Sequence, residues 1–155
     1  MSIAGLVALV GCVGHVRSYP LYPNPQARRE AGKVARLTGI VATVDGVDVA
    51  SHGDIFDLAP GCHLVTLVRS IGQGGEHEPW SVDVPRLVFA FKMTGGHAFV
   101  IEHQIHMNSD RNGSVTVSAT ERDGGGAIVA KVAPSRGAQD IEECRQWDPS
   151  QQATP

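Results

Sequence analysis

The stretch VARLTGIVATVDGVDVA, residues 34–50, decides the fold class. Its first eleven residues are mostly apolar or β-branched, a composition that is typical of strands. They end at Asp45-Gly46, a dipeptide that favours a tight hairpin turn because both positions tolerate positive φ. Apolar residues resume at Val47. The stretch therefore predicts a strand over residues 34–44 that turns into a second strand over residues 47–50.

Short strands separated by turns continue toward the C-terminus. Pro60-Gly61 and Gly95-Gly96 predict chain reversals. Further strands are predicted over residues 55–58, 62–70, 80–93, 97–107, 114–120 and 127–133. Pro85 cannot donate a ladder hydrogen bond, so its strand is expected at a sheet edge or with a bulge. Seven or eight short strands without a βαβ rhythm predict an all-β fold, an antiparallel β-sandwich of the immunoglobulin or transthyretin kind.

Helices are predicted in two short places only, around residues 26–32 and around residues 138–147. The last residues, 148–155, have the composition of a disordered C-terminal tail. These boundaries predict one sandwich domain over residues 34–147, which suits a chain of 155 residues.

The bulk composition is that of a globular protein, with 42% hydrophobic and 19% charged residues. The net charge is −3, and no basic run is longer than Arg28-Arg29. Binding to the phosphates of a nucleic acid needs clustered cations. The composition therefore argues against a nucleic acid as partner.

Residues 3–11 form an uncharged, mostly apolar run that ends at Cys12. The run is too short to span a bilayer, which takes about 20 residues, but it fits the core of a secretion signal, about 7–15 residues. Leu9-Val10-Gly11-Cys12 resembles the lipobox of bacterial lipoproteins. The resemblance implies that residues 1–11 are a signal segment and that Cys12 carries a lipid anchor. Because no Lys or Arg precedes Ile3, a buried N-terminal strand with a core cysteine is the alternative.

The segment after Cys12 is rich in Gly, Ser, Asn and Pro, so residues 12–33 are predicted to be a flexible tether. If Cys12 is lipidated, two of the three cysteines remain. Cys62 and Cys144 are then expected to form a disulfide in an oxidising periplasm. The alternative is two unrelated buried thiols.

Motifs between Tyr22 and Glu102 resemble a broad group of small bacterial lipoproteins of unassigned function. The quoted motifs are YPNP at residues 22–25, VDG at 44–46, LAPGCHLVTL at 58–67 and FAFKMTGGHAFVIE at 89–102. The second and third also resemble PEGA-type domains, which are small β-sandwiches. The chain departs from the pattern at Asn24 and Ala59, where Gly and Pro are common.

The resemblance implies a non-catalytic envelope lipoprotein with a PEGA-like sandwich, a structural or protein-interaction module. Val13 after Cys12 implies an outer-membrane anchor that leaves the domain facing the periplasm. The expected partners are the membrane, through the lipid on Cys12, and another envelope protein. No catalytic residue and no cofactor follow from the resemblance.

Seven histidines raise an alternative function, a periplasmic binder of a metal ion or small ligand. The densest group is Glu102-His103-x-x-His106. In a strand His103 and His106 point to opposite faces, so they are not expected to hold one ion together. His103 is expected to be half-buried on the apolar face with Phe99 and Ile101. His63, which follows the turn at Pro60-Gly61, is expected to bond a nearby carbonyl rather than a metal.

Motifs of other activities are missing. The sequence contains no Gly-x-Ser-x-Gly, Cys-x-x-Cys or His-Glu-x-x-His pattern. Glycine runs at residues 72–75 and 124–126 are predicted to be loops, because they do not open a helix after a strand. Trp80 is expected at the core or its rim, and Trp147 is expected to dock the C-terminal segment. A hydrolase or nucleotide-binding function is therefore not favoured.

Overall fold

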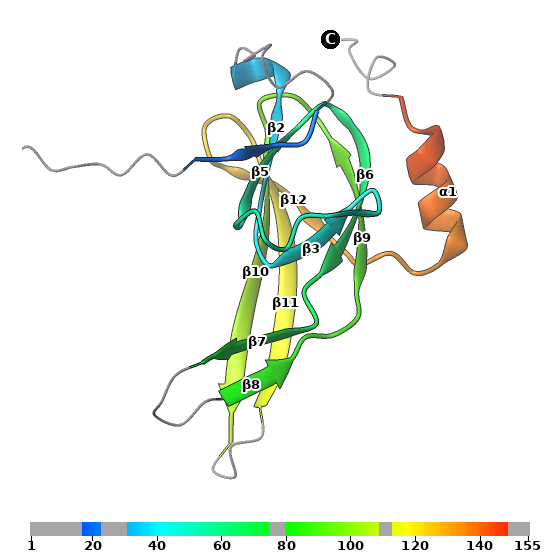
Figure 1. Cartoon of the computed structure of the whole chain (residues 1–155). Helices are drawn as coiled ribbons and strands as arrows, with labels where there is room; N and C mark the ends of the chain where they lie inside the picture. Colours follow the sequence, from blue (N-terminus) through cyan, green and yellow to red (C-terminus); the bar gives the residue numbers. More distant parts are fainter. Residues whose placement is uncertain (1–16, 23–30, 75–79, 109–112, 149–155) are drawn as a thin grey trace, which may run out of the picture.

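The computed structural model describes residues 17–22, 31–74, 80–108 and 113–148. In these ranges the chain is mostly β, with one 3-10 turn at Ala31–Lys33 and one α-helix, α1, at Ala138–Gln146 (Figure 1). The strands are β1 (Tyr19–Pro20), β2 (Ala35–Thr38), β3 (Val41–Val44), β4 (Val47–Asp48), β5 (Ile55–Leu58), β6 (Gly61–Leu67), β7 (Ser70–Gln73), β8 (Trp80–Asp83), β9 (Val88–Met93), β10 (Ala98–Met107), β11 (Gly113–Arg122) and β12 (Ile128–Val132).

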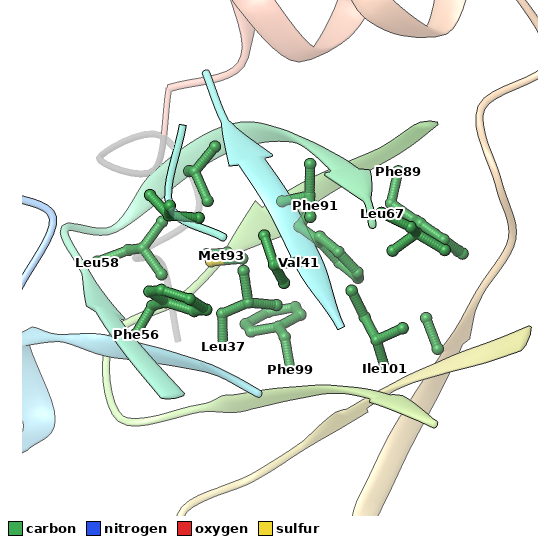
Figure 2. Close-up of a cluster of buried hydrophobic side chains, with 14 of the residues drawn as sticks. Leu37, Val41, Phe56, Leu58, Leu67, Phe89, Phe91, Met93, Phe99 and Ile101 are labelled. Atoms are coloured by element: carbon green, nitrogen blue, oxygen red, sulfur yellow. The ribbon is translucent and has the colours of Figure 1, made fainter. Parts of the chain in front are cut away.

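The strands form three sheets. One has six strands in the order β1-β5-β2-β10-β11-β12, one has four in the order β4-β3-β6-β9, and β7 pairs with β8 alone. Apolar side chains from the six- and four-stranded sheets meet in one core (Figure 2). Phe91 of β9 lies 5.5 Å from Phe99 of β10, ring centre to ring centre, in an edge-to-face contact. An edge-to-face aromatic contact therefore joins the two sheets within this core.

The prediction of a purely antiparallel fold is wrong, because the six-stranded sheet is mixed. β1 runs parallel to β5, and β2 runs parallel to β10. These strands are not neighbours along the chain, and each pair is joined by a connection that passes through other elements. Tight hairpins enforce antiparallel pairing only between consecutive strands.

The strand predicted over residues 34–44 is divided between two sheets. β2 ends at Thr38, and β3 begins at Val41 in the four-stranded sheet. Gly39 makes the crossing with φ 141°, and a Cβ placed there would lie 2.6 Å from the carbonyl oxygen of Ile101. Only glycine allows the backbone to pass β10 so closely.

The predicted hairpin at Asp45-Gly46 is confirmed. Asp45 and Gly46 have φ values of 50° and 81°, and Val44 pairs with Val47 across the turn. Two successive positive φ values are those of a type I′ turn.

The strand predicted over residues 80–93 is broken around Pro85 into β8 and β9. β8 pairs with β7, and this hairpin crosses the far half of the long β10–β11 hairpin (Figure 1). Val82 is buried there, and a Cβ on Gly113 would lie 2.6 Å from it. One face of the far half of β10–β11 is thus covered by β7–β8, and Val82 belongs to the same buried cluster as the residues of the two main sheets.

The predicted C-terminal helix is confirmed as α1, which contacts β6 and β9. Of the helix predicted over residues 26–32, the described part is the 3-10 turn at Ala31–Lys33. Within the predicted tether, residues 12–33, the structure describes a strand: β1 is paired with β5. Of the predicted tail, residues 148–155, all but Asp148 lie outside the described residues.

Candidate functional site

A disulfide joins Cys62 on β6 to Cys144 on α1, with the two Cα atoms 5.2 Å apart. Cys62 is directly opposite Lys92 of β9, and α1 lies along β6 and β9 (Figure 1). Cys144 is the buried residue of this helix, with 2% of its surface exposed. The remainder of α1 is mostly polar, and the disulfide links this helix covalently to β6.

His63 lies beside this attachment and bonds two oxygen atoms. Its Nδ1 is 2.7 Å from Oδ2 of Asp45, and its Nε2 is 2.8 Å from the carbonyl oxygen of Ala59. The prediction that His63 bonds a nearby carbonyl is confirmed. Both partners only accept hydrogen bonds, so both bonds exist together only when the ring is protonated on both nitrogens.

The pKa values of His63 and Asp45 are both shifted from their ordinary values. Burial opposes the charged form of His63, but hydrogen bonds to Asp45 and Ala59 and the charge of Asp45 outweigh it and raise the pKa of His63 above 6.5. Burial likewise opposes the charge of Asp45, but the bonds from His63 and from the Leu64 N–H lower the pKa of Asp45 below 3.8. The ion pair ties the β3–β4 turn to the start of β6. Sequence reasoning found the Asp45-Gly46 turn but missed the carboxylate as the partner of His63.

The two histidines of β10 lie apart, as predicted. His103 pairs with Val117 and His106 with Ser114, so their side chains leave opposite faces of the hairpin. The prediction that His103 is half-buried is wrong, because His103 is exposed. His103 lies between the buried Ile101 and the partly buried Ile105 on the same face of β10. The apolar alternation gives no sign that the position between them is open to solvent. Within the described part of the chain, no three His, Cys, Asp or Glu residues are grouped so as to hold a metal ion.

A second contact between a histidine and a carboxylate joins neighbouring segments of the six-stranded sheet. Nδ1 of His97 lies 2.6 Å from Oε1 of Glu121, and both side chains are partly buried. His97 follows the predicted turn at Gly95-Gly96 and starts the chain into β10. The sequence offers no local signal for this contact, because the partners are 24 residues apart.

A polar cluster fixes β1 to the sheet edge. Asp57 of β5 accepts hydrogen bonds from the Ser18 hydroxyl and, at 3.1 Å, from Nε of Arg36. The Leu21 N–H donates to the Asp57 carbonyl oxygen at 2.8 Å. The Tyr19 ring stacks on His52 with 3.9 Å between ring centres. Sequence reasoning missed this cluster, which we call the β1 clasp: Ser18, Tyr19, Leu21, Arg36, His52 and Asp57.

The tryptophans occupy the expected kinds of position. Trp80 packs partly buried against the core from β8. Trp147 is half-buried just after α1, and its backbone N–H donates to the Cys144 carbonyl oxygen. The far end of the β10–β11 hairpin carries a shallow, open hollow lined by His106, Met107, Asn108, Gly113 and Ser114. The described residues of this lining bring together a thioether, an imidazole, an amide and a hydroxyl.

Cys12, the predicted lipid attachment residue, lies outside the described residues. None of the helices in the described ranges is both long and apolar enough to cross a bilayer. The chain matches no known protein-family model, no curated protein and no solved structure. The resemblance to small lipoproteins and PEGA-type domains therefore stays a prediction from the sequence.

Proposed function

We propose that the protein is a non-catalytic envelope lipoprotein, a structural or protein-interaction module that Cys12 anchors to the outer membrane on its periplasmic side. The observation that supports this most is the Cys62–Cys144 disulfide. Structural disulfides form and persist in oxidising compartments such as the periplasm and are rare in the cytosol. The disulfide favours export, and export is what the lipobox-like segment would bring about.

The cysteine count supports the anchor. Two of the three cysteines are used by the disulfide, and Cys12 is left at the end of the lipobox-like run. One acyl chain binds a membrane only marginally, whereas the several chains of a mature lipoprotein bind firmly.

The polar side chains of the described sheets support a binding role rather than catalysis. Side-chain hydrogen bonds join His63 to Asp45 and His97 to Glu121. Strand β12 is an edge of the six-stranded sheet and carries two large exposed apolar side chains. These are Ile128 and Val129, with 55% and 51% of their surfaces exposed. An open sheet edge with apolar side chains is a common place for a protein partner to dock.

Labelling of cells with a palmitate analogue tests the anchor. The wild-type protein is expected to take up label and to fractionate with membranes, whereas Cys12→Ser is expected to do neither. The double variant Cys62→Ser/Cys144→Ser serves as control, because it removes two cysteines but keeps Cys12. Label that does not depend on Cys12, or its complete absence from the wild type, would contradict the proposal.

A non-reducing gel of protein from the same cells tests export separately. The wild type, trapped with a thiol-alkylating reagent, is expected to run as the disulfide form. Free thiols at both Cys62 and Cys144 would contradict a periplasmic location.

A further inference from the structure

The β1 clasp holds the chain to one edge of the six-stranded sheet soon after Cys12. Tyr19 pairs with Phe56 and Pro20 with Asp57 in the parallel β1–β5 ladder. The Asp57 side chain, which is 16% exposed, accepts a hydrogen bond from the Ser18 hydroxyl. The Tyr19 ring stacks on His52. Backbone pairing, a side-chain hydrogen bond and a ring contact thus converge on three consecutive residues.

The clasp shortens the reach of an anchor at Cys12. Ser18 lies six positions after Cys12. An extended chain spans at most about 3.3–3.6 Å per residue, or about 20 Å over these six steps. A free tether running to Lys33 would reach roughly 70 Å by the same measure. The folded domain can therefore move only a short distance from the anchored residue.

The clasp also determines which part of the domain is held nearest to the anchor. β1 is one edge strand of the six-stranded sheet, and β12 is the other. Five strand-to-strand steps of about 4.8 Å place the two edges about 24 Å apart. In the strand order, β1 lies beside β5, and β11 and β12 lie beyond β10. The exposed Ile128 and Val129 belong to the edge that is farther from Cys12.

We propose that the β1–β5 edge of the six-stranded sheet faces the lipid surface and that the β12 edge, with Ile128 and Val129, is presented away from it. This inference rests on the proposed acylation of Cys12. The clasp then keeps the domain close to the membrane. It leaves the apolar β12 edge accessible to a protein partner.

Whether the clasp holds Cys12 near the β1–β5 edge can be tested without any lipid. In protein produced without export and then oxidised, Cys12 is the free thiol and can carry a nitroxide. Amide signals in residues 50–55, beside β1, are expected to lose more intensity than those in residues 128–132. The variant Ser18→Ala/Tyr19→Ser removes the side-chain contacts of the clasp and is expected to reduce this difference. Lys131→Ala, on the far edge, is the matched control and should leave it unchanged.

Equal loss of intensity at the two edges in the wild type would overturn the proposal. So would an unchanged pattern in Ser18→Ala/Tyr19→Ser, because the clasp would then not be what holds the label near β5. Both variants alter exposed or partly exposed side chains, and their folding is checked by the dispersion of the same amide spectra.

Presentation at the membrane is tested with the acylated protein in vesicles of phosphatidylethanolamine and phosphatidylglycerol that contain a quencher lipid. A fluorophore on Ser51→Cys is expected to be quenched more strongly than one on Val129→Cys. Equal or reversed quenching in acylated protein would overturn the proposed orientation. Absence of acylation is seen in the palmitate labelling instead, so it would count against the proposed function and not against the clasp.

Discussion

At the scale of single residues, His63 shows how a turn motif becomes a charged contact. Its ring lies between the Asp45 carboxylate and the Ala59 carbonyl oxygen, and its side chain is only 14% exposed. The raised pKa of His63 means that its contribution to stability is complete below pH 6.5 and is lost as the pH rises through the folded value. The lowered pKa of Asp45 means that its contribution is present above pH 3.8 and is lost as the pH falls through the folded value.

The pair therefore stabilises the fold most in the interval between those two ordinary values. His63→Gln is expected to lower the free energy of unfolding by about 1 kcal/mol near pH 5.5, a modest figure because Asp45 is half exposed. The loss is expected to be smaller at about pH 8.5, because the stabilisation from His63 is lost as the pH rises through its folded pKa. Urea unfolding at the two pH values measures this. His103→Gln, at an exposed position on β10, is the control, and an equal loss at both pH values would contradict the charged pair.

Gly39 is the residue on which the division of the first predicted strand depends. Its φ of 141° and its approach to the Ile101 carbonyl oxygen leave no space for a side chain. Gly39→Ala is expected to cost about 2–3 kcal/mol of stability, because the backbone must shift at a strained position. Gly74→Ala, where a Cβ would meet no atom within 4 Å, should change stability by less than about 0.5 kcal/mol. Equal effects in thermal or urea unfolding would contradict the close crossing.

At the scale of elements, α1 is a short helix that the Cys62–Cys144 disulfide links to β6. Its sequence AQDIEECRQ is mostly polar, and Cys144 is its buried residue. Side-chain burial alone stabilises such a helix on the sheet only weakly. An isolated helix of nine residues is itself marginally stable in water.

Removal of the disulfide is expected to release this helix. Cys62→Ser/Cys144→Ser should lose about 4.5 kcal/mol by the chain-entropy estimate, because the cysteines are separated by 82 residues. Amide exchange in residues 138–146 should rise more than exchange in β6 and β9. Cys12→Ser is the control and should leave both measurements unchanged. A helix that keeps its protection in the double variant would show that other contacts hold it.

At the scale of the whole molecule, the two main sheets share one core. Phe89 and Phe91 of β9 are stacked with ring centres 5.5 Å apart, and Phe91 reaches Phe99 of β10 in the opposite sheet (Figure 2). All three rings are essentially buried. The two sheets are therefore expected to unfold together, and the β7–β8 hairpin contributes Val82 to the same buried cluster.

Phe91→Ala tests this shared core. It is expected to lower the free energy of unfolding by about 3–5 kcal/mol, because it removes the ring that bridges the sheets and leaves a cavity. Amide protection should fall in both β6 and β10. Phe91→Leu, which keeps most of the volume, should cost less. A loss of protection confined to the four-stranded sheet would contradict a single cooperative core.

The sequence by itself determined the local features of this protein. The Asp45-Gly46 turn, the short strands and the C-terminal helix all follow from residue types within a few positions of one another. The bond from His63 to the Ala59 carbonyl belongs to the same group, because the two residues are four positions apart.

The tertiary structure decided the features that join distant parts of the chain. After β2 the chain leaves the six-stranded sheet at Gly39, where it passes close to Ile101 of β10, about 60 positions later. Strand β1 is held by Asp57, 39 residues beyond Ser18. Parallel pairing, the exposure of His103 and the partnership of Asp45 with His63 likewise depend on which strands become neighbours. Periodicity states which side of a strand is apolar, but it does not state where the core ends or which strand lies alongside, because those contacts are made only when the whole chain has folded.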